Sequence, residues 1–212
     1  MSARDAVLDA FADLLIGDGE RAATLDAVAA RAQVSKGGLL YHFKSRDALV
    51  DGLIERLREL AAADVAAMRV APEGPSAYYV SSSDFAGSPL DRALVATARL
   101  AQNASPNARD AMREIQQQWY ALIAEEVGDP ASARAILLIG DGLYYNAALA
   151  GGPSSAPTPG GSAGDGGGAG DDGGDDGADG PAASEPEAEA DDDIAALLGV
   201  VELLKRHAAT RG

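Results

Sequence analysis

Apolar side chains recur at helical spacing along most of the chain, and short polar or glycine-containing breaks separate the runs. In the first run Val7, Phe11 and Leu14 share one helical face, and the helix is expected to end between Gly17 and Gly19. No segment shows a convincing alternation of apolar and polar residues, the pattern that indicates a strand. The sequence therefore predicts an all-α fold.

Three helix starts follow closely after this break. Thr24, Ser35 and Ser45 each precede a helical run, and their hydroxyls can cap the free N–H groups of a first turn. Leu39, Leu40 and Phe43 are expected on the inner face of the middle helix. The spacing predicts a helix-turn-helix unit, whose second helix enters the major groove of DNA. A generic helical hairpin is the alternative that the pattern alone leaves open.

Beyond this unit the pattern predicts a long helix from Ser45 to about Met68, which connects the DNA-binding head to the rest of the chain. Pro72 and Pro75 mark a break. Further helices, bounded by Gly, Pro or Asn, are expected over residues 76–86, 89–104, 107–127 and 130–150. The β-favouring run Tyr78–Ser83 makes the first of these four helices the most ambiguous.

Residues 151–193 differ from the rest of the chain, because they contain 13 Gly and 12 acids but no aromatic or large aliphatic side chain. Such a segment cannot offset its ordering entropy by burying apolar surface, so we expect a disordered, solvated linker. Its Gly-Asp stretches resemble calcium-binding repeats only superficially. The regularly placed aliphatic residue of those repeats and the final glutamate of an EF-hand loop are both missing. No metal site is predicted.

The net charge of −16 is unusual for a DNA-binding protein, but it is unevenly distributed. The linker holds 12 acidic and no basic residues, which leaves −4 for the remainder of the chain. Between Arg31 and Arg58, six basic residues stand against three acids. The positive surface that DNA requires is therefore local, and binding should depend strongly on salt.

Composition excludes several classes of site. The chain has no cysteine, hence no disulfide and no thiolate zinc site, and its two histidines, His42 and His207, are far apart. An enzyme would have to use carboxylates such as Asp84, Glu125 and Asp141, whose spacing defines no catalytic site, and there is no nucleophile elbow. We predict neither an enzymatic activity nor a cofactor.

Membrane insertion and export are not expected either. No apolar run is long enough to cross a bilayer, and the N-terminus lacks the basic and apolar regions of a signal peptide. We therefore expect a cytoplasmic protein without a membrane partner.

A motif in and around the helix-turn-helix unit is formed by Ala32, Val34, Ser35, Lys36, Gly37, Leu39, Phe43, Ser45 and Leu49. With these residues the segment resembles the N-terminal DNA-binding domain of the TetR family of bacterial transcriptional regulators, whose usual pattern is A-G-V-S-K-G-T-L-Y-x-x-F-x-S-K-x-x-L. The resemblance is close over about 50 residues, and the all-helical remainder is of a length typical for the family.

Three positions depart from the family pattern. Gln33 replaces the usual turn glycine, and it would be strained if its φ is positive. Leu40 replaces the common tyrosine, which moves the aromatic residue to Tyr41. Arg46 replaces a lysine and keeps its charge. These departures affect the expected contacts with DNA rather than the fold.

In a helix-turn-helix unit the first residues of the second helix meet base edges, and the surrounding donors bind phosphates. Lys36 can bond guanine acceptors, and Gly37 and Gly38 allow a close approach of the backbone. The other expected DNA contacts are Thr24, Ser35, Tyr41, His42, Lys44 and Arg46.

The resemblance implies that the helical region after the head senses a small molecule. Residues that could line its pocket combine flat apolar surface with a few polar groups: Tyr78, Tyr79, Phe85, Met112, Gln116, Trp119, Tyr120 and Tyr144. Ordinary core packing is the alternative for each of them. A pocket built from them would take a partly apolar or aromatic ligand.

After the linker the chain carries one apolar stripe, Ile194, Leu197, Leu198, Val201 and Leu204, which needs a partner helix. The helix over residues 130–150 is expected to supply it. Closing a loop of 43 residues rather than about 4 costs only about 2 kcal/mol more, less than the burial of the stripe yields. In the TetR family two such helices pair with their copies in a second subunit. The implied dimer interface comprises the stripe together with Ile136, Ile139, Gly140 and Leu143. An intramolecular hairpin in a monomer is the alternative.

The expected domains are a helix-turn-helix domain over residues 1–47, a helical regulatory domain over 48–150, the linker over 151–193, and a dimerisation helix over 194–212 that belongs to the regulatory domain. The expected function is a ligand-responsive repressor, which binds a palindromic operator in double-stranded DNA as a homodimer. A small, partly apolar effector would release it. An activator, or a ligand-independent DNA-binding protein of the same fold, is the alternative.

Overall fold

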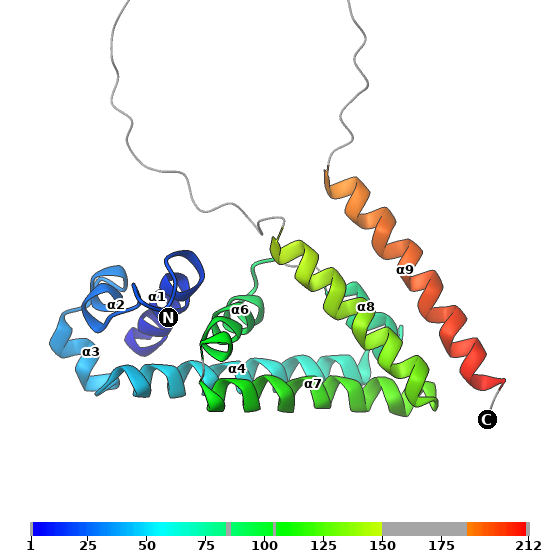
Figure 1. Ribbon diagram of the computed structural model, residues 1–212, viewed down its shortest axis with the longest axis horizontal. Coiled ribbons are helices and arrows are strands. Elements are labelled where there is room, and N and C mark those ends of the chain that lie inside the picture. Colours follow the sequence, from blue (N-terminus) through cyan, green and yellow to red (C-terminus); the bar gives the residue numbers. More distant parts are fainter. Residues whose placement is uncertain (1, 84–85, 104, 150–185, 211–212) are drawn as a thin grey trace, which may run out of the picture.

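The computed structural model describes residues 2–83, 86–103, 105–149 and 186–210, and for residues 147–149 and 186–192 it describes the backbone alone. This part of the chain forms nine α-helices and contains no strand, which confirms the expected all-α fold (Figure 1). No helix within it is long and apolar enough to cross a membrane. Most of the expected linker, residues 151–185, lies outside the described residues.

The first four helices are α1 (Ala3–Gly17), α2 (Leu25–Arg31), α3 (Lys36–His42) and α4 (Arg46–Val70). Thr24, Ser35 and Ser45 cap α2, α3 and α4 as expected. Each hydroxyl oxygen accepts the backbone N–H three residues later, at 3.0 to 3.2 Å. The sequence therefore sets the start of each helix locally, and α1 to α3 form the DNA-binding head.

Two long helices define the length of the molecule. α4 has 25 residues and lies beside α7 (Pro106–Val127), and the head is at one end of this pair (Figure 1). α6 (Pro89–Gln102) packs against both α4 and α7 and also against α1 of the head. The head is thus attached to the helical domain by α6 as well as by the chain itself.

The remaining helices gather at the other end of α4 and α7. They are α5 (Pro75–Ser81), α8 (Pro130–Leu149) and α9 (Pro186–Ala209). α8 and α9 run antiparallel and pack together, as the C-terminal apolar stripe predicts, and α9 also packs against α5 and α7 (Figure 1).

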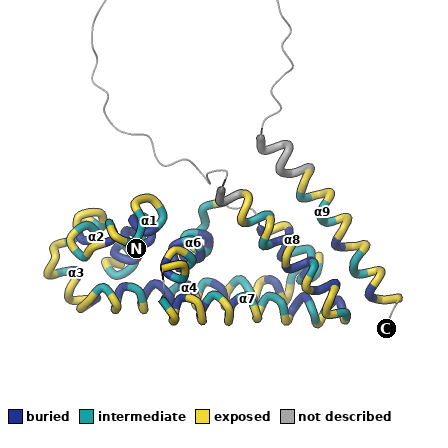
Figure 2. Tube along the Cα trace, in the orientation of Figure 1, coloured by how far each residue is buried: buried dark blue, intermediate teal, exposed yellow. Residues whose placement is uncertain are grey.

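Buried residues form two clusters (Figure 2). The head-side core joins α1 to α4 with α6 and the first half of α7, and includes Phe11, Leu39 and Leu57. The distal core joins α5, α8 and α9 with the far ends of α4 and α7, and includes Tyr79 and Val201. The two cores divide the described residues into a head-side and a distal end, which share one pair of long helices.

One carboxylate, Glu126, adds polar bonds to the packing of α9 against the other distal helices. Glu126 of α7 forms an ion pair with Lys205 of α9 at 2.8 Å. It also accepts a hydrogen bond at 2.7 Å from the backbone N–H of Ser76, at the start of α5. Burial raises the pKa of Glu126, but the bonds from Lys205 and Ser76 outweigh this and hold the pKa below its ordinary value. A Cβ at Gly74 would lie 2.4 Å from the Glu126 carboxylate, so this approach requires glycine.

Two helix boundaries differ from the sequence-based expectation. α9 begins at Pro186, inside the segment expected to be linker up to residue 193. Proline suits the first position of a helix, and the acids that follow it interact favourably with the helix N-terminus, so this end of the acidic segment is helical. α5 ends at Ser81, earlier than the expected residue 86.

Gln33, which replaces the usual turn glycine, has a positive φ of 55°. It follows the end of α2, where the N–H of Val34 bonds the carbonyl of Ala29 at 3.0 Å. A left-handed residue in this place closes the helix, and glycine is the residue that takes this conformation without strain. The turn before α3 is therefore strained at a residue that the family pattern identifies.

Candidate DNA-binding surface and ligand site

The outer surface of α3 carries the residues that the sequence assigns to DNA. Leu39 and Phe43 are buried in the head-side core, whereas Lys36 and His42 are exposed and Tyr41 is 84% exposed. Lys44, just beyond α3, is exposed too. The two faces are separated as predicted except at Leu40, which was expected to point inward and is 37% exposed, because it follows Leu39 by one residue and so lies about 100° around the helix.

The first turn of α3 contains two glycines and few nearby side chains. A Cβ at Gly37 would meet only the Ser35 hydroxyl, at 4.0 Å, and one at Gly38 would lie 3.3 Å from the same oxygen. The Thr24 and Ser35 hydroxyls accept backbone N–H groups as caps, and each can still donate its own hydrogen to a phosphate. This end of the head therefore presents donors without bulky side chains.

Two of the expected cations are paired within the protein. The Lys36 ammonium lies 2.8 Å from Asp26 of α2, and Arg46 lies 2.8 Å from Glu20, in the loop before α2. The first pair is largely exposed and the second is half-buried. Asp26 and Glu20 were not predicted as parts of the site, because they stand 10 and 26 residues from their partners and no local pattern links them.

In the helical domain the structure brings four of the expected ligand residues together around two carboxylates. Asp64 of α4 accepts the Tyr78 hydroxyl at 3.0 Å and the Trp119 indole N–H at 2.8 Å. Asp141 of α8 accepts the Tyr79 hydroxyl and the Gln116 amide, both at 2.7 Å. The Tyr79 and Trp119 rings lie 5.7 Å apart. We call these six residues the acid–aromatic cluster.

The carboxylates influence the tyrosines of the acid–aromatic cluster. Burial and the nearby Asp64 raise the pKa of Tyr78 to about 12. Burial, followed by the charge of Asp141, raises the pKa of Tyr79 further still. Both hydroxyls therefore remain protonated donors at neutral pH, and each holds its carboxylate in place.

The other expected ligand residues lie elsewhere. Tyr144 donates to the main-chain oxygen of Asp91 at 3.1 Å, and Met112 packs against the head-side core. The Tyr120 hydroxyl lies 3.4 Å from the Pro130 carbonyl, at the outer end of α7. Phe85 lies outside the described residues. The expected list thus combines a real cluster with separate packing positions.

Some residues expected at a dimer interface are buried within the chain itself. Ile136 and Val201 are fully buried in the distal core, and Gly140 is covered by Tyr79. Ile139, Leu143, Ile194, Leu197, Leu198 and Leu204 are partly buried. Among the side chains of α8 and α9 that the structure describes, the large apolar ones left exposed are Leu138, Tyr145, Val200 and Leu203.

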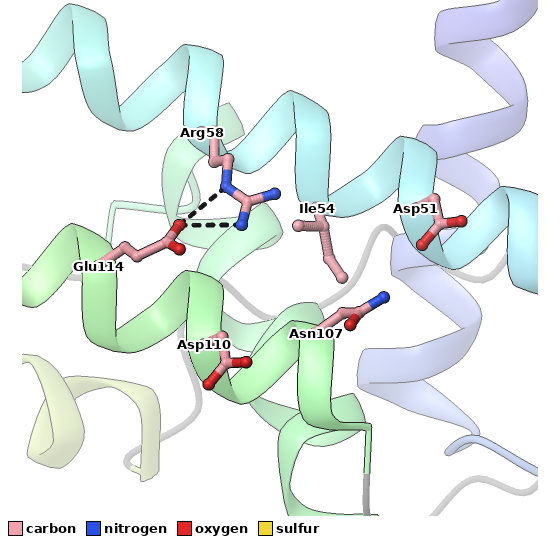
Figure 3. Close-up of a pocket in the computed structure, with 6 residues that line it drawn as sticks. All are labelled: Asp51, Ile54, Arg58, Asn107, Asp110 and Glu114. Atoms are coloured by element: carbon pink, nitrogen blue, oxygen red, sulfur yellow. Dashed lines mark hydrogen bonds and ion pairs between the residues drawn. The ribbon is translucent and has the colours of Figure 1, made fainter.

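A pocket of about 380 Å³ lies between the head-side halves of α4 and α7 (Figure 3). Its lining is mostly charged or polar: Asp51, Ile54, Arg58, Asn107, Asp110 and Glu114. Arg58 spans it with two bonds to Glu114, at 3.2 and 2.9 Å. None of these residues belongs to the expected ligand site, and the lining does not suit a partly apolar ligand.

Comparisons with known proteins agree with this architecture. Residues 7–53 match the family described as bacterial regulatory proteins, tetR family, and residues 75–158 match the tetracyclin repressor-like C-terminal domain. No curated protein sequence matches the chain.

Two solved structures show the same fold. One is the multidrug binding protein EbrR complexed with imidazole, which is 24% identical, covers 73% of this chain and 89% of its own, and has a TM-score of 0.51. The other is SCO7518 from Streptomyces coelicolor A3(2), a candidate transcriptional regulator. It is 23% identical, covers 72% of this chain and 91% of its own, and has a TM-score of 0.52. Both family matches, and a head whose recognition helix faces outward, lead to one conclusion: the chain belongs to the TetR family of bacterial DNA-binding transcription regulators.

Proposed function

We propose that the protein is a repressor that binds a palindromic operator as a homodimer and leaves it when a small, partly apolar molecule binds the helical domain. The observation that carries the proposal is the outer face of α3, where Lys36 and Tyr41 are exposed beside a first turn of glycines, with the exposed Lys44 just beyond the helix. A helix of this kind can enter the major groove with its N-terminal residues against the base edges.

The exposed faces of α8 and α9 support a homodimer. Leu138 and Tyr145 stand seven residues apart on one face of α8, and Val200 and Leu203 lie close together on α9. A Cβ added at Gly142 or at Gly199, on the same two helices, would meet no atom within 4 Å, which leaves room for a second helix to approach. A twofold axis there would present two heads to two half-sites of an operator.

Contacts through α6 support the coupling of ligand to DNA. Tyr144 of α8 donates to the main chain of Asp91 in α6, and the adjacent Arg92 forms an ion pair with Asp13 of α1. Asp141, in the acid–aromatic cluster, lies one turn before Tyr144 on α8. A shift of α8 on ligand binding would therefore reach α1 and change the separation of the two heads.

Selection of bound fragments from the host genome tests the proposal, because it identifies the operator directly from the DNA that the protein retains. A palindromic site bound by a dimer is the expected result, and expression of a reporter from that site should rise when the gene is deleted. A fall in expression would indicate an activator. Binding that no small molecule changes would indicate a ligand-independent protein.

The proposed function also implies a location. Because the operator is chromosomal DNA, the protein should act in the bacterial cytoplasm. Fractionation of host cells, followed by detection of the protein with an antibody, would test this expectation.

A further inference from the structure

The exposed lysines in and beside α3 differ in whether an acid of the same chain holds them. The ammonium of Lys36, the first residue of α3, lies 2.8 and 3.1 Å from the two carboxylate oxygens of Asp26 in α2. Lys44, just beyond α3, is also exposed, and no acid of the described residues pairs with it. The cation expected at base edges is thus neutralised by a partner, whereas this cation expected at a phosphate is not.

Stability does not account for the pair of Lys36 and Asp26. Their side chains are 58% and 72% exposed, and an ion pair so exposed adds little to folding, because solvent screens it. The charge of Asp26 favours the first turn of α2, but that effect needs no contact with Lys36. Beside a surface that meets DNA a carboxylate is also unfavourable, since phosphates repel it. The contact is therefore better explained by its effect on Lys36.

A carboxylate changes which acceptors the ammonium prefers. An ammonium has three N–H donors, so Lys36 can keep one bond to Asp26 and give the others to O6 and N7 of a guanine. A phosphate bound to the same ammonium would bring its negative charge close to the carboxylate, and this repulsion opposes the attraction. The pair with Asp26 therefore weakens a phosphate contact more than it weakens a contact with a neutral base edge.

We propose that Asp26 is a positioning residue for DNA recognition, which directs Lys36 to guanine edges rather than to phosphates. Phosphates are common to every duplex, whereas a guanine at a given place is a property of the operator. The ion pair thus raises the ratio of operator binding to the binding of other DNA. The inference rests on the proposed function, since α3 must enter the major groove.

Asp26→Asn tests the inference, because it keeps the size of the side chain and removes its charge. The affinity of the full-length protein for a duplex of random sequence should rise at least about fivefold, since Lys36 becomes free to bind a phosphate. The logarithmic salt dependence of this binding should steepen by about one for each head on the DNA. Affinity for the selected operator should rise by less than about twofold. Equal rises on both duplexes would overturn the inference.

Asp110→Asn is the matched control. Asp110 pairs with Arg113 at 2.8 Å, and both side chains are exposed on α7, outside the head. This variant loses the same charge and should bind both duplexes as the natural protein does. If it raises the affinity for the random duplex as much as Asp26→Asn, net charge alone is responsible and the inference is wrong. Helicity and thermal unfolding show whether each variant remains folded.

Lys36→Met tests whether Asp26 acts through Lys36, because it removes the ammonium and keeps an apolar side chain. In the natural protein this change should weaken operator binding at least about fivefold and random-duplex binding by less than about twofold. In the Asp26→Asn variant it should weaken random-duplex binding at least about fivefold, since the freed ammonium then binds a phosphate. Equal weakening of random-duplex binding in the two backgrounds would mean that Asp26 only repels DNA, which overturns the inference.

The same measurements separate this inference from the proposed function. If the natural protein binds the operator and Asp26→Asn leaves random-duplex affinity unchanged, the role of Asp26 is wrong and the regulator stands. If the natural protein retains no operator, the proposed function fails and the inference fails with it.

Discussion

The head-side core and the distal core are built from different chemistry. In the head-side core, Phe11, Leu39 and Leu57 belong to a cluster in which aliphatic side chains predominate. In the distal end, Tyr79 is buried with its hydroxyl on Asp141, and Trp119 directs its indole N–H to Asp64. Aliphatic packing fixes one arrangement by shape, whereas a hydrogen-bonded cluster can exchange its partners for those of a ligand. The comparison separates an end held by the shape of its side chains from an end held partly by hydrogen bonds between them.

The largest effect is expected when packing is removed from the head-side core and a hydrogen bond is removed from the distal core. Phe11→Ala, in the fully buried head-side core, should cost about 3–5 kcal/mol of unfolding free energy. Tyr79→Phe keeps the ring and removes only the bond to Asp141, so it should cost about 1–2 kcal/mol. Chemical denaturation measures both. Equal costs would mean that the distal core depends on its polar bonds as much as the head depends on packing.

Substitutions on the outer face of α3 should weaken operator binding without unfolding the protein. Lys36→Ala combined with Tyr41→Ala should weaken operator binding by about 100-fold, since each removed contact is worth about 1–3 kcal/mol, and helicity should not change because both side chains are exposed. A mobility-shift assay measures the affinity. Arg69→Ala, an exposed cation at the far end of α4, is the matched control and should bind normally. A double variant that binds like the control would remove α3 from the interface.

Surface and core positions of α9 can be distinguished by adjacent substitutions. Leu203→Asp places a charge on a side chain that is 59% exposed, and it should weaken dimerisation at least about tenfold while the monomer stays folded. Val201→Asp should instead detach α9, because Val201 is fully buried in its own chain. Light scattering reports the first effect and thermal unfolding the second. Val70→Asp, an exposed apolar residue on α4, is the control, and a dimer that survives Leu203→Asp would place the interface elsewhere.

Acid should weaken the attachment of α9. The pKa of Glu126 is depressed in the folded protein, so its contribution to stability is present above the ordinary value of 4.5 and is lost as the pH falls through the folded value. Glu126→Gln should therefore cost about 1–2 kcal/mol at pH 7 and progressively less below pH 4.5. Unfolding of both proteins across this range measures the difference. If the difference in unfolding free energy between the two proteins persists at low pH, the charge of Glu126 is not what stabilises α9.

The smallest effect is expected in the turn before α3. Gln33→Gly relieves a positive φ of 55° and should raise the unfolding free energy by about 0.5–1 kcal/mol. Gln33→Ala should give no such gain, because alanine retains a Cβ. If Gln33→Gly does not raise the unfolding free energy either, the positive φ of Gln33 does not strain the turn.

The head could be predicted from the sequence because its signals are local. Ser35 caps α3 three residues ahead of its N–H partner, and Leu39 and Phe43 repeat within one helix. The acid–aromatic cluster has no such signal: Asp64 and Trp119 are 55 residues apart, and Tyr79 and Asp141 are 62 apart. The aromatic members could be named as pocket candidates by type. Their carboxylate partners depend on how α4, α7 and α8 pack, which no local pattern specifies.

The start of α9 shows a different limit. The composition of the acidic segment indicates a linker, and composition averages over residues that behave differently. Pro186 and the acids after it form a good helix N-terminus, which the average conceals. Ile136 and Val201, expected at a dimer interface, are covered within their own chain for a related reason. A helical stripe shows which side chains need cover but not whether the cover comes from the same chain.

The attachment of α9 has a consequence for how the protein can be taken apart. Its contacts, the buried Val201 and the bond from Lys205 to Glu126, are all noncovalent and involve the other distal helices. Because α8 and α9 belong to one polypeptide, the effective concentration of α9 near the other distal helices is high. α9 is in this sense a peptide ligand carried on its own chain. A synthetic peptide with the sequence of α9 should compete with α9 for its contacts on the other distal helices. A protein divided into two polypeptides between α8 and α9 should reassemble.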